Sequence, residues 1–154
     1  GCLMSDCRIV LVAPHQLYLV EDAVMKHLKP AIDLAHGRHS VETASYSIKE
    51  GHHQLWAAVD GDSIIGALVT YVEHYPLLKM LNYLWIGGDR LDDWNTQMLE
   101  TLDKFAKEND CSGAEVCGRY GWKKYMEKFG WQTEYIICQR MFDDDVVEEK
   151  RDAA

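Results

Sequence analysis

The sequence has 154 residues and carries 25 acidic against 16 basic side chains, for a formal net charge of −9. Hydrophobic residues make up 47% of it and charged residues 27%, proportions typical of a folded globular domain rather than of a disordered chain. A protein that binds nucleic acid needs a positive face to neutralise phosphates, so this charge balance argues against nucleic acid as a partner. No apolar run has the length needed to span a bilayer, and we expect no membrane partner.

The cysteines and histidines predict neither a disulfide framework nor a metal centre. The five cysteines form neither an even set nor a Cys-x-x-Cys pair, and a reducing, cytoplasmic location is the simpler interpretation. Four histidines fall near the ends of the predicted helices, without the spacing of zinc ligands: His36, His39, His52 and His53. We therefore predict no metal site.

The first half of the chain predicts one strand, two helices and then three strands. A β-branched run at 7–13 predicts the first strand, and helical spacing of apolar residues predicts helices over 15–35 and 40–51. Pro30 is expected to kink the first helix or to divide it in two. Three further runs, separated by turn residues, predict an antiparallel meander over 54–59, 63–75 and 78–86.

The second half begins with the clearest helix of the chain. A wide apolar stripe runs from Leu91 to Ala106, followed by a short strand at 114–117. A basic helix then ends at Phe129-Gly130-Trp131, and a β-rich run at 133–142 predicts a last strand. A helix between two strands of one sheet implies a parallel crossover.

The stretch around this basic helix resembles a motif of the GCN5-related N-acetyltransferases (GNAT). That family often carries Asn-x-x-Ala-x-x-x-Tyr-x-x-x-Gly-Phe here, and Gly130-Trp131 match its Gly-Phe corner. Arg119 then falls on the Asn, Trp122 on the Ala and Met126 on the Tyr. This sequence therefore matches the family's Gly-Phe corner, but it has different residues at the family's Asn, Ala and Tyr positions.

The resemblance implies a GNAT-like α/β (α+β) fold. This is a mixed, mostly antiparallel sheet of about six strands, with helices on both faces. We expect one domain over residues 7–142. Residues 1–6 are expected to be disordered or a cloning remnant, and residues 143–154 to be a flexible acidic tail.

The resemblance also implies a coenzyme site where the third meander strand meets the long helix. The family binds the diphosphate with Arg/Gln-x-x-Gly-x-Gly/Ala at this helix N-terminus, a position where backbone N–H groups attract anions. Here the stretch reads Gly87-Gly88-Asp89-Arg90-Leu91-Asp92-Asp93, with glycines at the wrong end and aspartates where phosphates would lie. The predicted coenzyme-binding residues are Trp85, Ile86, Gly87, Gly88, Asp89, Arg90 and Arg119.

The residues expected to move protons are Glu73, His74 and Tyr125. Glu73 or His74, near the end of the second meander strand, would accept the amine proton, but neighbouring strand residues face opposite ways, so at most one can reach the cleft. Because Met126 has no proton to give, Tyr125 is the candidate acid for the leaving thiolate. For both tyrosines of this region, Tyr120 and Tyr125, aromatic packing is the alternative.

Two functions remain open from the sequence. One is an N-acyltransferase that moves an acetyl group from acetyl-coenzyme A to an amine on a small molecule or protein. The other is a GNAT-fold protein that has lost the coenzyme and serves as a binding or structural component, with a protein partner or a second copy of itself. The pattern of losses loosely resembles the GNAT-like proteins of tailed bacteriophages.

Overall fold

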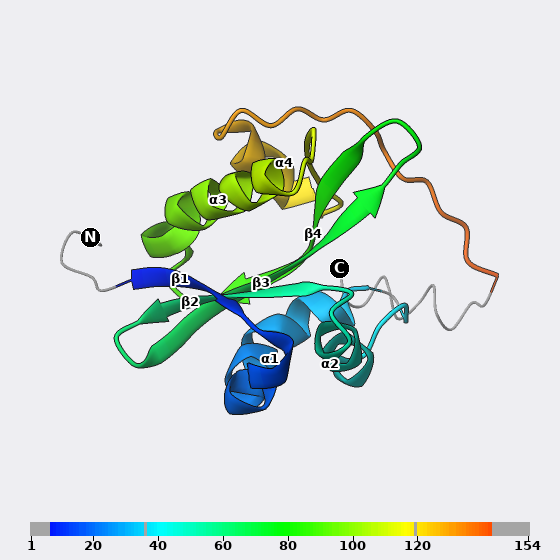
Figure 1. Ribbon diagram of the computed structural model, residues 1–154. Helices are drawn as coiled ribbons and strands as arrows, with labels where there is room; N and C mark the ends of the chain where they lie inside the picture. The colour runs from blue at the N-terminus through cyan, green and yellow to red at the C-terminus, as the bar shows by residue number, and fades with distance from the viewer. Residues whose placement is uncertain (1–6, 36, 119, 143–154) are drawn as a thin grey trace.

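The computed structural model describes residues 7–35, 37–118 and 120–142, and its centre is a five-stranded sheet in chain order (Figure 1). The first three pairings are antiparallel, and β4 and β5 pair in parallel. The predicted mixed, mostly antiparallel sheet is thus confirmed, with five strands where about six were expected. The strands are β1 (Cys7–Val12), β2 (Gln54–Asp60), β3 (Ser63–His74), β4 (Lys79–Gly88) and β5 (Gly113–Val116).

Helices cover both faces of the sheet (Figure 1). On one face, α1 (Leu17–Asp33) follows a single 3-10 turn, η2 (Pro14–Gln16), and packs beside α2 (Val41–Lys49). On the other face lie α3 (Leu91–Glu108) and α4 (Tyr120–Glu127).

The strands are apolar on both sides because each side faces a helix layer. Successive side chains of β2 alternate, so Leu55 and Ala57 join the α1/α2 core while Trp56 and Ala58 join the α3/α4 core. Among the described helices, none has the length and hydropathy that crossing a bilayer demands.

Pro30 does not divide the first helix. Helix α1 runs without a break from residue 17 to 33, so the prediction of two shorter helices is wrong. Pro30 removes one backbone hydrogen bond near the end of the helix, whereas Leu28 and Ile32, on either side of it, are fully buried against the sheet. Burial of that stripe outweighs the lost bond.

The predicted strand over 133–142 is also wrong, because residues 131–142 contain no strand. Tyr135, Ile136 and Ile137 in this segment are 85%, 79% and 70% exposed. A strand needs a neighbour to satisfy its backbone groups. Here β5, the last strand of the sheet, has only four residues, and residues 131–142 pair with no strand despite their strand-like composition.

Candidate functional site: the open edge of β4 and the residues around it

Strand β4 loses its second neighbour halfway along its length. Its parallel pairing with β5 ends at Tyr83 and Val116. On the other side Thr70 of β3 pairs with Tyr83 and Val69 with Trp85, which leaves Leu84 as one extra residue, a β-bulge. Within the described chain, residues 84–88 therefore have a strand partner on one side only.

The bulge explains how the predicted residues Trp85 and Ile86 are placed. Leu84 and Trp85 both pack on the α1/α2 side, where strict alternation would have separated them, and Ile86 returns to the α3/α4 side. The Trp85 ring is 5% exposed and meets the rings of His39 and His53 edge-on, at centroid distances of 5.0 and 6.1 Å. The backbone of this half-strand, rather than its side chains, is what faces the open edge.

The loop that follows is tied to the sheet and to α1. A Cβ atom at Gly87 would overlap the carbonyl of His27 in α1, and one at Gly88 would overlap the backbone of β3 at Gly66. The backbone N–H of Asp89 donates to Ile65 O at 2.7 Å. These two glycines allow the backbone of the loop to pack closely against α1 and β3. The Asp89 N–H already donates to Ile65 O.

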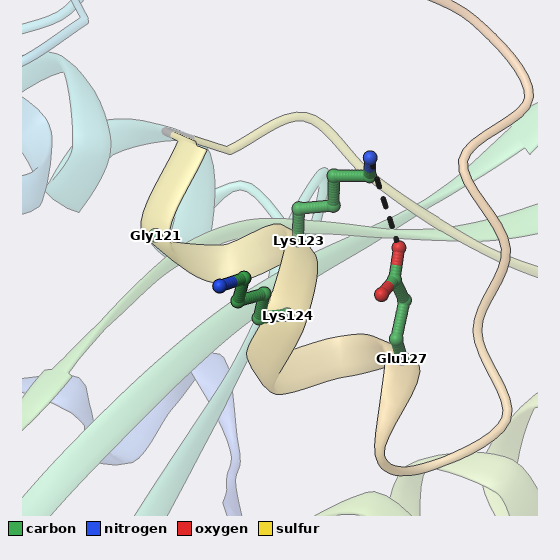
Figure 2. Close-up of a pocket in the computed structure, with 4 residues that line it drawn as sticks. All are labelled: Gly121, Lys123, Lys124 and Glu127. Atoms are coloured by element: carbon green, nitrogen blue, oxygen red, sulfur yellow. Dashed lines mark ion pairs between the residues drawn. The ribbon is translucent and has the colours of Figure 1, made fainter.

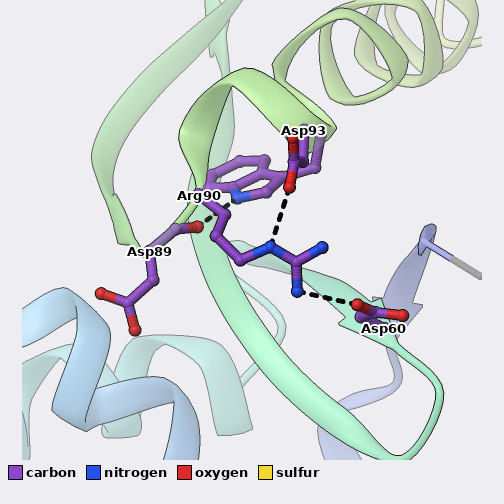
Figure 3. Close-up of polar contacts among 5 residues, drawn as sticks. Asp60, Asp89, Arg90 and Asp93 are labelled. Carbon is purple, nitrogen blue, oxygen red and sulfur yellow. Dashed lines mark hydrogen bonds and ion pairs between the residues drawn. The ribbon is translucent and has the colours of Figure 1, made fainter. Parts of the chain in front are cut away.

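Arg90 is held between two aspartates (Figure 3). Its Nε donates to Asp93 Oδ2 at 2.8 Å, and a terminal nitrogen donates to Asp60 Oδ2 at 2.8 Å. The residue has a left-handed backbone, with φ of 54°, which turns its side chain back across the end of β2. Hydrogen bonds to Asp60 and then Asp93 keep the pKa of the guanidinium above its ordinary value.

The two parts of this region fit coenzyme A unequally. The one-sided stretch of β4 offers backbone groups to which an extended, amide-bearing arm can bond as a strand would. The cation at the turn into α3 is already engaged, because Arg90 is bonded to two carboxylates. Asp89 and Asp92, both exposed beside it, add repulsion.

The predicted bases Glu73 and His74 lie on opposite faces of β3. Val69 packs in the α1/α2 core and Thr70 bonds to Trp56 of the other core, so alternation places Glu73 on the α1/α2 side and His74 on the α3/α4 side. Glu73 is half-buried and His74 is exposed. Glu73 therefore shares a face with Trp85, and His74 does not.

A polar cluster that the sequence did not predict lies beside Glu73. Glu115 of β5 accepts hydrogen bonds from Tyr75 Oη at 3.0 Å and from Asn82 Nδ2 at 3.4 Å. The pKa of Tyr71 is raised, first by burial and then by the negative charges of Glu73 and Glu115. We call these five residues, 71, 73, 75, 82 and 115, the Glu115 cluster. The one signal for it in the sequence was a carboxylate within the apolar run 114–117.

Tyr125, the predicted acid, points towards α3. Asn95 Nδ2 donates to its hydroxyl, and its ring packs against Trp122 and Phe129 at centroid distances of 5.3 and 5.4 Å. Burial is the main cause that raises its pKa. Met126, at the position of the family's tyrosine, is 7% exposed in the α3/α4 core. Arg119 lies outside the described residues.

The outer surface of α4 carries lysine side chains and has an open hollow. Gly121, Lys123, Lys124 and Glu127 line a hollow of about 340 Å³, in which Lys123 and Glu127 form an ion pair at 4.0 Å (Figure 2). The picture shows Lys124 pointing away from this pair. None of the predicted catalytic residues lines the hollow. Within the described residues, no group of histidine, cysteine or acidic side chains is arranged to hold a metal ion.

No family model matches the sequence, and no curated protein sequence matches it. Solved structures do match, at low identity. A ribosomal-protein-alanine N-acetyltransferase from Brucella melitensis superposes with a TM-score of 0.67 at 12% identity, covering 89% of this chain and 99% of the other.

Two further matches agree with it. An integron cassette protein from V. cholerae gives a TM-score of 0.66 at 11% identity, covering 93% of this chain and 96% of its own. An aminoglycoside acetyltransferase from an uncultured soil metagenomic sample superposes with a TM-score of 0.66 at 12% sequence identity. The match covers 90% of this chain and 99% of the other. The sheet, its helix layers and these superpositions show that this chain has the GNAT fold.

Proposed function

We propose that this protein is an N-acyltransferase that moves an acetyl group from acetyl-coenzyme A to an amine. The observation that supports the proposal most directly is the one-sided half of β4. It begins at the Leu84 bulge, beside a cluster of proton-accepting and hydrogen-bonding side chains. A transferase needs such an arrangement, an extended site for the acyl carrier next to groups that bind an amine.

In this proposal the backbone of residues 84–88 holds the pantetheine arm, and the side chains of Trp85 and Ile86 fix the strand from either face. Gly87, Gly88 and Asp89 shape the turn, while Arg90 and Arg119 remain the predicted contacts to the diphosphate. When bound, the coenzyme supplies the activated acetyl thioester. Because Arg90 is engaged by Asp60 and Asp93, we expect the coenzyme to bind weakly.

Proton transfer is assigned to the predicted residues as far as their placement supports it. Glu73 is favoured over His74 as a base, because it lies on the face of the Glu115 cluster. Tyr125 keeps the acid role because its phenol, whose pKa burial raises, carries a proton at neutral pH, whereas Met126 has none to give. The Tyr125 hydroxyl accepts from Asn95 and so retains a proton to donate.

Calorimetric titration with acetyl-coenzyme A, and separately with coenzyme A, tests this proposal. We expect a saturable one-to-one isotherm in the micromolar range for both ligands. Absence of heat up to millimolar ligand would overturn the proposed transferase. Substitution of Glu73 and Tyr125 in an assay for released thiol then tests their roles.

A second candidate is a GNAT-fold binding or structural protein without coenzyme, of the kind found in tailed bacteriophages. The arrangement that favours it is the pairing of Arg90 with Asp60 and Asp93, which uses the cation nearest the expected diphosphate for stability. In that case neither acetyl-coenzyme A nor coenzyme A gives heat of binding in the titrations, and a protein partner occupies the open edge of β4 instead.

A further inference from the structure

Glu115 occupies a defined place at the point where β4 and β5 separate. It pairs with Asn82, and the next pair, Tyr83 with Val116, is the last of the parallel ladder. Its neighbour Ala114 packs in the α3/α4 core, so alternation turns Glu115 to the α1/α2 face, the face of Tyr71 and Glu73. The carboxylate therefore stands one residue pair from the stretch proposed to hold the acyl carrier.

Two neutral groups orient this carboxylate. Tyr75 Oη and Asn82 Nδ2 both donate to Oε2, at 3.0 and 3.4 Å. In the part of the chain that the structure describes, neither Glu115 nor Glu73 forms an ion pair. A carboxylate has about four acceptor sites, so Glu115 retains acceptor capacity for a further donor.

A histidine ring packs against Tyr71 of the Glu115 cluster, and this ring carries no positive charge that would compete with a ligand. The ring of His53 packs against Tyr71 at a centroid distance of 5.5 Å. Burial, followed by the charges of His39 and His52, lowers the pKa of His53 below its ordinary value, so it is neutral at neutral pH. Aromatic faces beside two carboxylates favour a bound organic cation.

We propose that Glu115 is the residue that binds the acceptor amine, and that the acceptor is a primary alkylamine without an anionic group near its nitrogen. The protonated amine donates to Glu115, held in place by Tyr75 and Asn82, while Glu73 adds negative charge. A phosphate or carboxylate on the acceptor close to the amine would be repelled by the same two side chains. This inference rests on the proposed transferase function, which it makes specific.

The reaction balances with this assignment. The ammonium held by Glu115 releases one proton to solvent through Glu73, the proposed base, and its nitrogen then forms a bond to the thioester carbonyl carbon. The carbon–sulfur bond breaks, the nitrogen loses a second proton, and the thiolate takes one up. The products are an amide, a thiol and one proton in solution.

Binding of the amine can be measured without coenzyme. The probe is putrescine, titrated into protein with isotope-labelled tyrosine, and the NMR signals of the Tyr71 and Tyr75 rings are followed. We expect saturable shifts of both signals, and no saturable shift with phosphoethanolamine, an amine that carries a phosphate. Glu115→Gln should weaken putrescine binding about tenfold or more, because one charge-assisted hydrogen bond is lost.

Glu100→Gln is the matched control, since Glu100 is an exposed carboxylate on α3, and it should leave putrescine binding unchanged. If turnover is observed, Glu115→Gln should raise KM for the amine and lower kcat while leaving the affinity for acetyl-coenzyme A unaltered. Unchanged putrescine binding in Glu115→Gln, or none in the unsubstituted protein, would overturn the inference. Putrescine binding without any acetyl-coenzyme A binding would instead keep the amine site and reject the transferase.

Discussion

The two ends of β4 differ in how their charged side chains are partnered. At its C-terminal end, the turn into α3 pairs Arg90 with Asp60 and Asp93. At its N-terminal end, Asn82 and Tyr75 orient the carboxylate of Glu115 without neutralising it. One end uses its charges to hold the loop, and at the other end the described contacts to the carboxylate come from neutral donors.

This difference indicates whether the coenzyme half or the amine half of the proposed site binds its ligand more weakly. A loop whose cation is already bonded to two carboxylates gains little from a diphosphate, because each new contact must replace an existing one. A carboxylate fixed by neutral donors binds a cation without breaking an ion pair. We therefore expect recognition of the acceptor to be stronger than recognition of the coenzyme, and four predictions test this contrast.

The largest effect is expected at Gly87, where backbone packing holds the loop in place. Gly87→Ala would drive a Cβ into the carbonyl of His27 and should lower the free energy of unfolding by about 3 kcal/mol. Gly61→Ala is the control, because nothing lies within 4 Å of a Cβ there and only the positive φ of 60° opposes it. It should cost about 1 kcal/mol. Urea unfolding compares the two, and equal losses would show that the loop is not tightly packed.

The next effect concerns the engaged arginine. Asp93→Asn removes one partner of Arg90 and one negative charge beside the expected diphosphate, so acetyl-coenzyme A should bind about tenfold more tightly. Asp103→Asn makes the same chemical change at an exposed position further along α3, and it should have little effect. Calorimetry measures both. An unchanged affinity in Asp93→Asn would place the diphosphate elsewhere or reject coenzyme binding.

A smaller effect is expected at Tyr83, the last β4 residue paired with β5. It is 6% exposed, its ring packs on Trp131 at a centroid distance of 5.2 Å, and its hydroxyl has no hydrogen-bond partner in the described residues. Tyr83→Phe should raise the free energy of unfolding by about 1 kcal/mol, because a buried unsatisfied group is removed. Tyr46→Phe, at an exposed ring, should change nothing. A loss of stability in Tyr83→Phe would reveal a partner for the hydroxyl.

The smallest effect is a shift in tyrosine ionisation at the Glu115 cluster. The pKa of Tyr75 is raised chiefly by its hydrogen bond to Glu115, and that of Tyr71 by burial and then by Glu73 and Glu115. Glu115→Gln should lower both pKa values, and NMR-detected titration of the two rings measures this. For a phenol whose pKa is raised by folding, the associated stability is present below its unfolded pKa and lost as pH rises through the folded value. The contribution of these two phenols to the free energy of unfolding should therefore be larger in the parent than in Glu115→Gln near neutral pH, and this difference should vanish at alkaline pH.

Much of the fold could be predicted from the sequence because its signals are periodic and local. Residues 63–75 were predicted as a strand and β3 spans Ser63–His74, while the predicted stripe from Leu91 to Ala106 lies in α3, Leu91–Glu108. The errors share one cause, since both depended on distant partners. Pro30 stays within a helix because the sheet buries its neighbours, whereas residues 133–142 form no strand because they make no ladder with the four-residue β5 or with another strand.

The sequence by itself determined the order of the elements as far as α4, the mixed sheet and the acidic turn before α3, since patterns of adjacent residues encode each of these. Only the tertiary structure decided what the charges do. The ion pair between Arg90 and Asp60 joins residues 30 positions apart, and the bonds to Glu115 span 33 and 40 positions. A hydrogen bond depends on distances of about 3 Å that chain folding creates, and no local pattern records which side chains will meet.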